Sequence, residues 1–494
     1  MHETDRAPKE LLHLASRFWQ QQGVPALERY VTIPCLSPDF DPDWELHGHL
    51  RTAALQMREW VDALELAGTT TEILQLPGLT PFLLVDVAPS PAAGVETKST
   101  LIYGHLDKQP PAGPWRIGDA FTPTRKDEAL YGRGAADDGY ALFAALGAIR
   151  SLQQLGIPHG RCVVIIEASE ESMSIHLDAY LQHERLAAAL GVTGPGLMVC
   201  LDSGCPTYDR LWVTTSMRGH VVLTLRADVL TEEAHSGGYG GLVPDSFRVL
   251  RQLLSRIEDP LTGFIQVEEC HSAVPTYRAK QIRQLVRELG ADSVNQAPAL
   301  PGLAERSGPD HEALARMVYA QTWEPSLAVT GADGLPTVQD GGSVIRPFTT
   351  TKLSMRIAPS ADPSQAANAV RARLVATPPE GARVTVEILN TGAGFDAPPV
   401  EPWLDHATET ASAEYYGSPA ASVGRGGTNP FLSAVSDRFP GAQVLATGVL
   451  GPGSNAHAPD EMLHLPTVEK LTASLAHILS QACRERPSRP EEPQ

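Results

Sequence analysis

The sequence has few cysteines and no long hydrophobic run. Its six cysteines, spread over 494 residues, form no CxxC pair and no dense disulfide framework, so we expect reduced thiols. No stretch approaches the roughly 20 apolar residues that a membrane span requires. The first residues, MHETDRAPKE, place acids beside bases and lack the apolar run of a signal peptide. We therefore expect a cytoplasmic protein.

Positive charge is also scarce. Lys and Arg number 39 against 58 Asp and Glu, which gives a formal net charge of -19. An acidic surface repels phosphate backbones and anionic lipid headgroups, so we expect no nucleic acid partner and no membrane partner. The 42 Gly and 41 Pro indicate many turns between ordered elements. The length exceeds that of one globular domain, which is roughly 100 to 200 residues.

Four apolar runs have the length of buried strands in an α/β sheet. They are residues 100–103 (TLIY), 162–168 (CVVIIEA), 197–201 (LMVCL) and 443–449 (QVLATGV). Between the first two, residues 140–155 show apolar side chains at helical spacing, and Gly156 with Pro158 ends this helix. Because a strand, a helix and a strand form the unit of a parallel sheet, we predict an α/β domain with a mostly parallel sheet and helices on both faces.

The pattern changes after residue 216. Strands with alternating apolar and polar side chains, as expected of a sheet with one solvated face, are predicted at residues 221–225, 353–357 and 383–388. A helix is predicted from Asp245, its cap, to Ile257, and another begins at Asp362 and Pro363. The predicted buried face of the first helix comprises Phe247, Leu250, Leu254 and Ile257. This middle part is therefore an inserted α+β domain.

The buried-strand pattern returns after about residue 397, so the first domain is predicted to be discontinuous. It comprises residues 1–216 and 397–483, and the inserted domain comprises residues 217–396. Residues 484–494, RERPSRPEEPQ, alternate charge with proline and cannot bury apolar surface, so we expect a disordered tail.

Polar residues follow the ends of the buried strands. In open α/β sheets, ligands bind at the carboxyl ends of the strands, so these loops are expected to converge on one crevice, together with the GRGAADD segment before the first helix. The candidate metal ligands in these loops are His105, Asp137, Glu171, Asp202 and His457.

Two imidazoles and three carboxylates suit a pair of zinc-like ions that share one bridging carboxylate. Two metals about 3.5 to 4 Å apart hold a hydroxide between them and polarise a carbonyl. Asp107, two residues beyond His105, can accept the other ring N–H of that histidine and fix its tautomer. Glu170, adjacent to Glu171 but outside the ligand set, is the candidate base.

Each feature alone has a simpler interpretation. A His after a strand is usually a turn residue, paired Glu on a loop usually forms a solvated edge, and Asp-Asp before a helix usually serves as a cap. GRGAAD also resembles a dinucleotide-binding loop, but Asp137 stands where the third glycine of GxGxxG belongs. The combination therefore favours the metal site.

The combination resembles the M20 family of metallopeptidases, through GHLDKQPP, LYGRGAADDG, EASEES, the Asp of LDSG, EAHSGGYGG, SMRIAP and GSNAHAPDE, in family order. The long insertion is most similar to the branch of carnosine and cytosolic nonspecific dipeptidases. The resemblance implies one zinc on His105, Asp137 and Asp202. It implies a second zinc on Asp137, Glu171 and His457. It also implies Glu170 as general base on a metal-bridging water and a cis peptide between Asp137 and Asp138.

The resemblance makes the insertion a lid and dimerisation domain, so we expect a homodimer. The His of the HSG motif, here His235, would reach the partner subunit's site and help to stabilise the oxyanion. Ser343 matches the other contact made across subunits. Arg356 matches the residue that grips the substrate carboxylate, and Gly427 and Thr428 match the loop that lines the same pocket. Without the resemblance, simpler interpretations would be favoured for these three residues: an exposed turn residue for His235, a loop hydroxyl for Ser343 and the solvated side of a strand for Arg356.

The predicted function is hydrolysis of the amide bond of a dipeptide or similar small substrate with a free carboxylate by a two-zinc enzyme, with Mn or Co as alternative metals. The nearest alternative is an N-acyl amino acid deacylase or amidohydrolase, including one that serves a biosynthetic pathway. A third is a catalytically silent binding protein, against which the intact Glu170 argues. Gly139 and Tyr140, Lys108 and Ala458 depart from the family pattern and are expected to alter the lining of the crevice, so no particular dipeptide is assigned.

Overall fold

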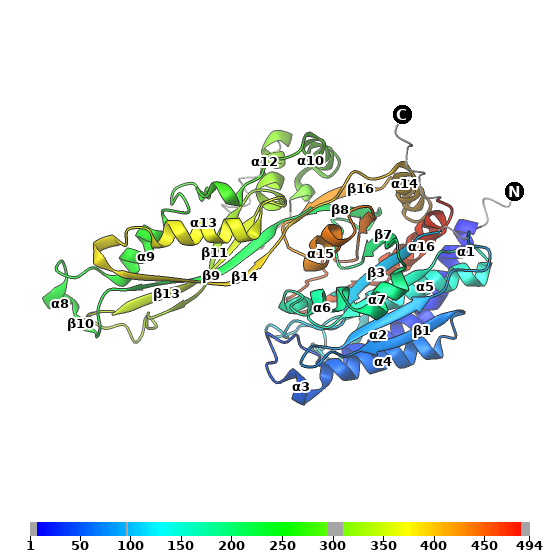
Figure 1. The fold of residues 1–494 in the computed structure, drawn as a ribbon, viewed down its shortest axis with the longest axis horizontal. Coiled ribbons are helices and arrows are strands. Elements are labelled where there is room, and N and C mark those ends of the chain that lie inside the picture. The colour runs from blue at the N-terminus through cyan, green and yellow to red at the C-terminus, as the bar shows by residue number, and fades with distance from the viewer. Residues whose placement is uncertain (1–6, 95–96, 295–309, 486–494) are drawn as a thin grey trace. The chain divides into compact units, whose positions relative to one another are not determined.

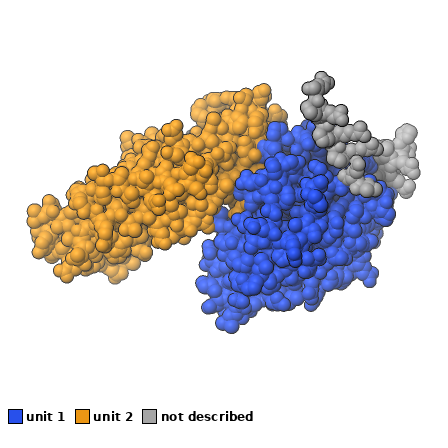
Figure 2. Space-filling model, in the orientation of Figure 1, with its two compact units in different colours: residues 1–214, 397–423, 431–494 blue, residues 215–396, 424–430 orange. Residues whose placement is uncertain are grey.

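The computed structural model describes residues 7–94, 97–294 and 310–485. The chain forms two compact units (Figure 2). The first unit comprises residues 1–214, 397–423 and 431–494, and the second comprises residues 215–396 and 424–430. Residues 486–494 of the predicted tail lie outside the described residues.

The first unit is built on one large sheet (Figure 1). Seven of its strands are, in spatial order, β1 (Thr69–Leu74), β2 (Phe82–Val87), β6 (Cys162–Glu167), β3 (Ser99–His105), β7 (Pro195–Cys200), β17 (Gln443–Ala446) and β8 (Trp212–Met217). The four central strands, β6, β3, β7 and β17, are parallel to one another. Antiparallel strands flank them on both sides.

The central strands are mostly apolar because helices cover both faces of the sheet. Every residue of β3 and β6 is buried. Ile102 belongs to the core that includes α5 (Tyr140–Leu155) and α16 (Leu465–Ala482). The next residue, Tyr103, faces the opposite side and stacks on Phe431 of α15 (Pro430–Arg438), with ring centroids 3.8 Å apart. The predicted sheet with helices on both faces is therefore confirmed.

Helix α5 has the predicted bounds, and Gly156 caps it in the left-handed conformation with φ 65°. The other helices of this unit are α1 (Ala7–Phe18), α2 (Val24–Val31), α3 (Trp44–His47), α4 (His49–Ala63), α6 (Leu177–Leu181), α7 (Glu184–Leu190) and α14 (Pro402–Tyr416). A small antiparallel sheet joins β4 (Thr124–Lys126), β5 (Ala129–Tyr131) and β18 (Met462–His464). Strand β16 (Ala421–Arg425) leads into the second unit.

The second unit contains a four-stranded antiparallel sheet. In spatial order its strands are β11 (Ser326–Asp333), β13 (Phe348–Ile357), β9 (Gly219–Asp228) and β14 (Arg383–Gly392). Burial alternates along β13, as predicted for a sheet with one solvated face. The apolar face packs against α9 (Ser246–Leu254) and α13 (Pro363–Val375). The remaining elements are α8 (Ser236–Tyr239), α10 (Thr276–Leu289), α12 (His311–Thr322) and the short strands β10 (Ala234–His235), β12 (Val344–Ile345) and β15 (Phe395–Asp396).

Both predicted helix caps of this unit are present. The carboxylate of Asp245 accepts the amide of Arg248 at 2.9 Å, and Asp362 caps α13 in the same way. The predicted buried face of α9 is partly wrong, because Phe247 is 42% exposed. Within α9 the buried apolar side chains are those of Val249, Leu250 and Leu253, and Ile257 is buried just beyond the end of the helix. In the described part of the chain, no helix combines the length and apolar character needed to cross a bilayer.

Candidate metal centre

The candidate ligands lie in loops at one end of the central strands of the first unit. His105 is the last residue of β3, and Asp202 lies two residues beyond β7. Glu171 lies in a short 3-10 turn, Glu170–Ser172, after β6. Asp137 lies between β5 and α5, and His457 lies between β17 and β18. Loops far apart in the sequence therefore meet because their strands are adjacent and parallel.

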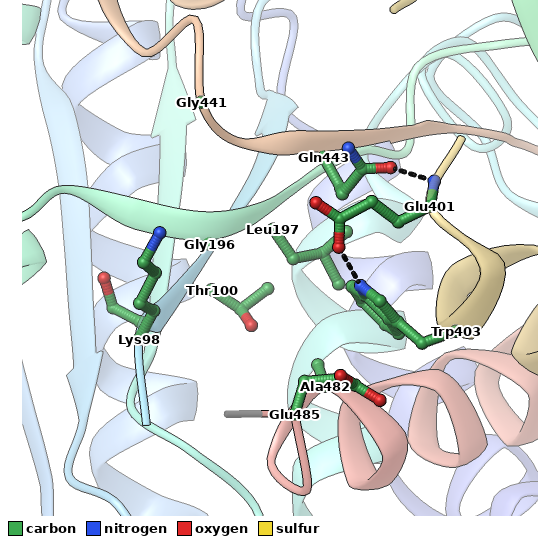
Figure 3. A pocket seen from close by; sticks show the side chains of 11 residues that line it. Lys98, Thr100, Gly196, Leu197, Glu401, Trp403, Gly441, Gln443, Ala482 and Glu485 are labelled. Carbon is green, nitrogen blue, oxygen red and sulfur yellow. Dashed lines mark hydrogen bonds between the residues drawn. The ribbon is translucent and has the colours of Figure 1, made fainter. Parts of the chain in front are cut away.

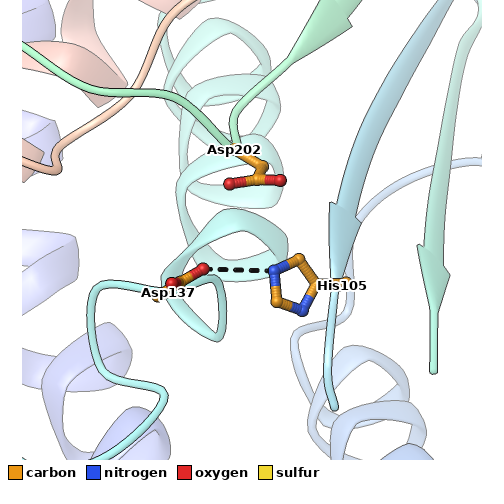
Figure 4. Close-up of side chains that lie close together, drawn as sticks. All are labelled: His105, Asp137 and Asp202. Atoms are coloured by element: carbon orange, nitrogen blue, oxygen red, sulfur yellow. Dashed lines mark hydrogen bonds and ion pairs between the residues drawn. The ribbon is translucent and has the colours of Figure 1, made fainter. Parts of the chain in front are cut away.

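These side chains form two groups that share one carboxylate. His105, Asp137 and Asp202 place ligand atoms within 4.8 Å of one another, as do Asp137, Glu171 and His457. Asp137 Oδ1 lies 3.3 Å from His105 Nε2, and Asp137 Oδ2 lies 3.0 Å from His457 Nε2. Figure 4 shows His105, Asp137 and Asp202 around a common point. With two imidazoles and three carboxylates, the donor set fits two divalent cations bridged by Asp137.

Negative charge is concentrated and buried in these groups. Burial raises the pKa of Asp202 to about 6, and nearby Asp137 adds to this shift. Burial and Asp137 also raise the pKa of Glu171. Hydrogen bonds from His105 and His457 outweigh burial at Asp137 and lower its pKa. Asp137 and Glu171 in turn raise the pKa of His457 to about 11 against the effect of burial. Cations at this position would relieve the repulsion among the carboxylates.

Glu170 lies beside both groups. Its side chain is 12% exposed, and its Oε2 lies 3.9 Å from His105 Nε2. Burial and the charge of Asp202 raise the pKa of Glu170. Ligand atoms of Glu170, His105 and Glu171 also lie within 4.8 Å of one another, so Glu170 is close enough to act on anything bound between the groups. The peptide between Asp137 and Asp138 is cis, as the family resemblance implies.

Asp107 holds the Glu170 turn as well as facing His105. His105 Nδ1 lies 3.1 Å from the backbone carbonyl of Asp107 and 3.5 Å from its carboxylate. The carboxylate accepts the amides of Glu170 at 3.1 Å and Glu171 at 3.0 Å. The nearer partner of the ring is thus the carbonyl, and the carboxylate orients the loop that carries Glu170 and Glu171.

The structure adds three neighbours that the sequence did not single out. Gln109 Nε2 donates to Glu171 Oε2 at 2.7 Å. Arg133 and Glu461 form a buried ion pair at 2.6 Å between the loops of Asp137 and His457. All three residues lie inside the motifs that carry the resemblance, but the motifs alone do not predict which residues these side chains contact.

Two of the expected crevice residues lie elsewhere. Lys108 is completely buried, and its ammonium donates to three backbone carbonyls at and beyond the end of α2. Tyr140 is also buried, and its hydroxyl donates to the carbonyl of Leu201. The expectation that they line the crevice is therefore wrong. A Cβ at Gly139 would lie 2.2 Å from Tyr30 Cε1, so this close approach requires glycine.

The predicted substrate residues all lie in the second unit. Arg356 Nη1 donates to Thr428 Oγ1 at 2.9 Å, and Gly427 precedes Thr428. His235 pairs with Val344 across β10 and β12, next to Ser343, whose carbonyl accepts the amide of Ser236 at 2.9 Å.

Arg356 with Thr428, and His235 with Ser343, lie at opposite ends of β13. His235 lies near the Phe348 end, whereas Arg356 lies at the other. At roughly 3.4 Å per residue, β13 separates Phe348 from Arg356 by about 27 Å. One subunit therefore does not bring its own His235 and Arg356 to one small ligand.

A cavity of about 80 Å³ lies at the opposite, amino ends of β3, β7 and β17 (Figure 3). Its walls include Thr100, Trp403, Gln443 and the carboxylates of Glu401 and Glu485. The indole of Trp403 donates to Glu401 at 2.8 Å, and Gln443 Oε1 accepts the Glu401 amide at 2.8 Å. These partners place Glu401 in a local network at the far end of the strands from the ligand groups.

The fold and the paired ligand groups define an α/β metallohydrolase. The chain belongs to peptidase family M20/M25/M40, whose model matches residues 101–481, so the resemblance is confirmed. The cysteinylglycine-S-conjugate dipeptidase of Corynebacterium striatum is 27% identical over 391 residues, covering 78% of this chain and 81% of the relative.

Two solved structures share the fold. The dipeptidase Dug1p of Saccharomyces cerevisiae aligns with a TM-score of 0.76 at 19% identity, over 97% of this chain and 99% of the other. Human carnosine dipeptidase 1 aligns with a TM-score of 0.74 at 18% identity, over the same shares. The expected mixed α/β fold is therefore confirmed.

Proposed function

We propose that this chain is a two-metal hydrolase that cleaves the amide bond of a dipeptide or similar small substrate with a free carboxylate. The observation that carries the proposal is the shared position of Asp137 between two ligand groups, with Glu170 beside both. The dipeptidase names of similar proteins support the substrate class. Zinc is the proposed metal, with Mn or Co as alternatives, because imidazole and carboxylate ligands suit all three. Six free cysteines fit the proposed cytoplasmic setting.

Glu170 is the proposed general base. Two bound cations would supply Lewis-acid polarisation of the amide carbonyl and a lowered pKa for water. Glu170 takes a proton from the attacking water, whose oxygen bonds to the carbonyl carbon, and returns the proton to the amine as the C–N bond breaks. The raised pKa of Glu170, caused by burial and Asp202, favours this exchange, although bound cations would oppose the shift.

Arg356 is proposed to bind the substrate carboxylate, with Thr428 and Gly427 beside it. A guanidinium presents two parallel N–H donors to a carboxylate. The partner subunit's His235 is proposed to stabilise the oxyanion, with the partner subunit's Ser343 next to it. The length of β13 between His235 and Arg356 of one chain supports this division between two subunits. The proposed active form is therefore a homodimer, assembled through the second unit.

Glu170→Gln tests the central assignment. The variant should lose turnover of a mixed dipeptide library by at least about 1000-fold while keeping the metal content of the wild type, because the base is proposed to lie outside the ligand set. Glu59→Gln, an exposed change on α4, is the matched control. Metal content would be measured on zinc-loaded, dialysed protein. The structure also groups Glu170 with His105 and Glu171, so Glu170 could itself be a metal ligand. Loss of metal in Glu170→Gln would show this and would contradict its assignment as a base outside the ligand set.

Product analysis on the wild type tests the substrate class. A dipeptidase releases two amino acids, whereas a deacylase releases one amino acid and a carboxylic acid without an amino group. Turnover of N-acyl amino acids alone would replace the dipeptidase proposal with the deacylase. No turnover of either class by zinc-loaded protein would favour the silent binding protein.

A further inference from the structure

The loops that carry Asp137 and His457 leave one small sheet side by side. Strand β5 ends at Tyr131, just before the Asp137 loop, and β18 begins at Met462, just after the His457 loop. Tyr131 and Met462 are paired in the antiparallel register. The pairing continues one step further, because the Gly132 amide donates to the Glu461 carbonyl at 3.0 Å.

The Glu461 carboxylate is enclosed by the Asp137 loop. Its Oε1 accepts the amides of Gly134 at 3.0 Å, Ala136 at 3.1 Å and Asp137 itself at 3.2 Å. Successive amides that converge in this way form a pocket for an anion, and here a carboxylate of the same chain fills it. The side chain of Glu461 has no exposed surface, so this negative charge depends entirely on its protein partners.

Arg133 connects the same carboxylate to the other loop. Its Nη1 donates to Glu461 Oε2 at 2.6 Å, and its Nη2 donates to the carbonyl of Ala458 at 3.1 Å. Ala458 follows His457 directly, and the Arg133 side chain is only 1% exposed. The pair therefore contacts the backbone at Asp137 on one side and next to His457 on the other.

We propose that Arg133 and Glu461 are positioning residues that fix Asp137 against His457 and thereby assemble the second ligand group. Across that group, His457 Nε2 lies 3.0 Å from Asp137 Oδ2 and 3.2 Å from Glu171 Oε2. The first group draws His105 and Asp202 from the ends of β3 and β7, whose backbones the pair does not contact. Because Asp137 belongs to both groups and His457 only to the second, breaking the pair should weaken the second metal site more than the first. This inference rests on the proposed two-metal function.

The test is metal binding by the full-length protein. Glu461→Gln keeps the shape of the side chain and removes its charge, Arg133→Met removes the guanidinium, and Arg133→Lys keeps the charge. Arg161→Met is the matched control, because Arg161, just before β6, forms a two-bond ion pair (2.8 and 2.7 Å) with Asp86 of β2, away from the ligand groups. Chelated protein would be titrated with Zn²⁺ by calorimetry, and the metal retained after dialysis would be counted.

The wild type and Arg161→Met should bind two equivalents. Glu461→Gln and Arg133→Met should bind one equivalent about 10- to 100-fold more weakly, the effect typical of residues that orient metal ligands. The other equivalent should show a smaller loss, because Asp137 is shared by both groups. Arg133→Lys should recover part of that loss. His457→Ala should lose the same equivalent, and adding Glu461→Gln to it should weaken the remaining site only by the smaller loss that Glu461→Gln causes there alone.

Two results would overturn the inference while leaving the proposed function intact. One is a Glu461→Gln variant that binds both equivalents with wild-type affinity. The other is an equal loss at both sites, which indicates general destabilisation. If Glu461→Gln does not fold, the Zn²⁺ affinities of Arg133→Met and Arg133→Lys at the two sites provide the same test. A wild-type protein that binds none of Zn²⁺, Mn²⁺ and Co²⁺ would refute the proposed function itself, and this inference with it.

Discussion

Replacing Glu167 with glutamine is expected to stabilise the protein at alkaline pH. Glu167 ends β6, is 2% exposed, and accepts hydrogen bonds from Tyr103 (2.6 Å), Ser174 (2.8 Å) and Ser169 (3.1 Å). The two serines flank the turn that begins at Glu170, so the carboxylate anchors that turn. Burial raises the pKa of Glu167 to about 7 although the hydroxyls of Tyr103 and Ser174 oppose the shift.

The raised pKa makes the stability depend on pH. The ordinary pKa is 4.5, so between pH 4.5 and about 7 the folded state binds more protons than the unfolded state, and stability falls as pH rises. At 1.36 kcal/mol per pKa unit, the loss reaches about 3.4 kcal/mol by pH 8 and stays below about 1 kcal/mol at pH 5. Glutamine carries no charge, and its amide can accept from Tyr103 and donate to Ser169. Glu167→Gln should therefore gain up to about 3 kcal/mol over the wild type at pH 8.

Urea unfolding of chelated, full-length protein at pH 5 and pH 8, followed by circular dichroism, measures this difference. Glu59→Gln, exposed on α4, controls for the removal of one negative charge. Comparing each variant with the wild type at the same pH cancels the groups that they share. A free-energy difference between Glu167→Gln and the wild type that is equal at the two pH values would refute the reasoning.

Two further predictions concern the second unit. Arg356→Lys should raise KM about 10-fold for substrates with a free carboxylate, because lysine lacks the two parallel donors, and should leave KM unchanged for the corresponding carboxamides. Equal effects on the two kinds of substrate in steady-state assays would show that Arg356 does not bind the carboxylate. His235→Ala and Glu170→Gln should each be inactive, and an equal mixture should recover about one quarter of wild-type activity, because half of the dimers would contain one intact site. No recovery after subunit exchange, verified by mass spectrometry, would contradict the trans assignment.

The sequence predicted most of the elements that position the site. The bounds of α5 follow from its periodicity and from Gly156, and each buried strand of the parallel sheet was found because a strand covered on both faces must be apolar throughout. The face of α9 was harder to predict. Phe247 and Leu253 each lie three residues from Leu250, on opposite sides of it, so the periodicity allows two faces. Packing against the sheet buries Leu253 and leaves Phe247 exposed.

Side-chain direction limited the prediction of the site. Lys108 directly follows Asp107, and sequence position alone suggested a place in the crevice. In the structure its ammonium turns to the carbonyls at the end of α2, and burial lowers the pKa of Lys108 to about 8. The ion pair of Arg133 and Glu461 joins residues 328 positions apart. No spacing rule predicts such a contact, because it depends on the pairing of β5 with β18.

The contacts around the ligand groups hold together loops whose carboxylates repel one another. The carboxylates of Asp137, Glu171 and Asp202 repel one another, and burial strengthens that repulsion by removing water. Loops that carry such groups would separate unless other contacts held them. Asp107 holds the Glu170 turn through two backbone amides, and Glu461 holds the Asp137 loop through three. The ligand geometry is thus fixed through the backbone, by carboxylates outside the ligand set, so that divalent cations would meet preorganised ligands and contribute their binding free energy to folding.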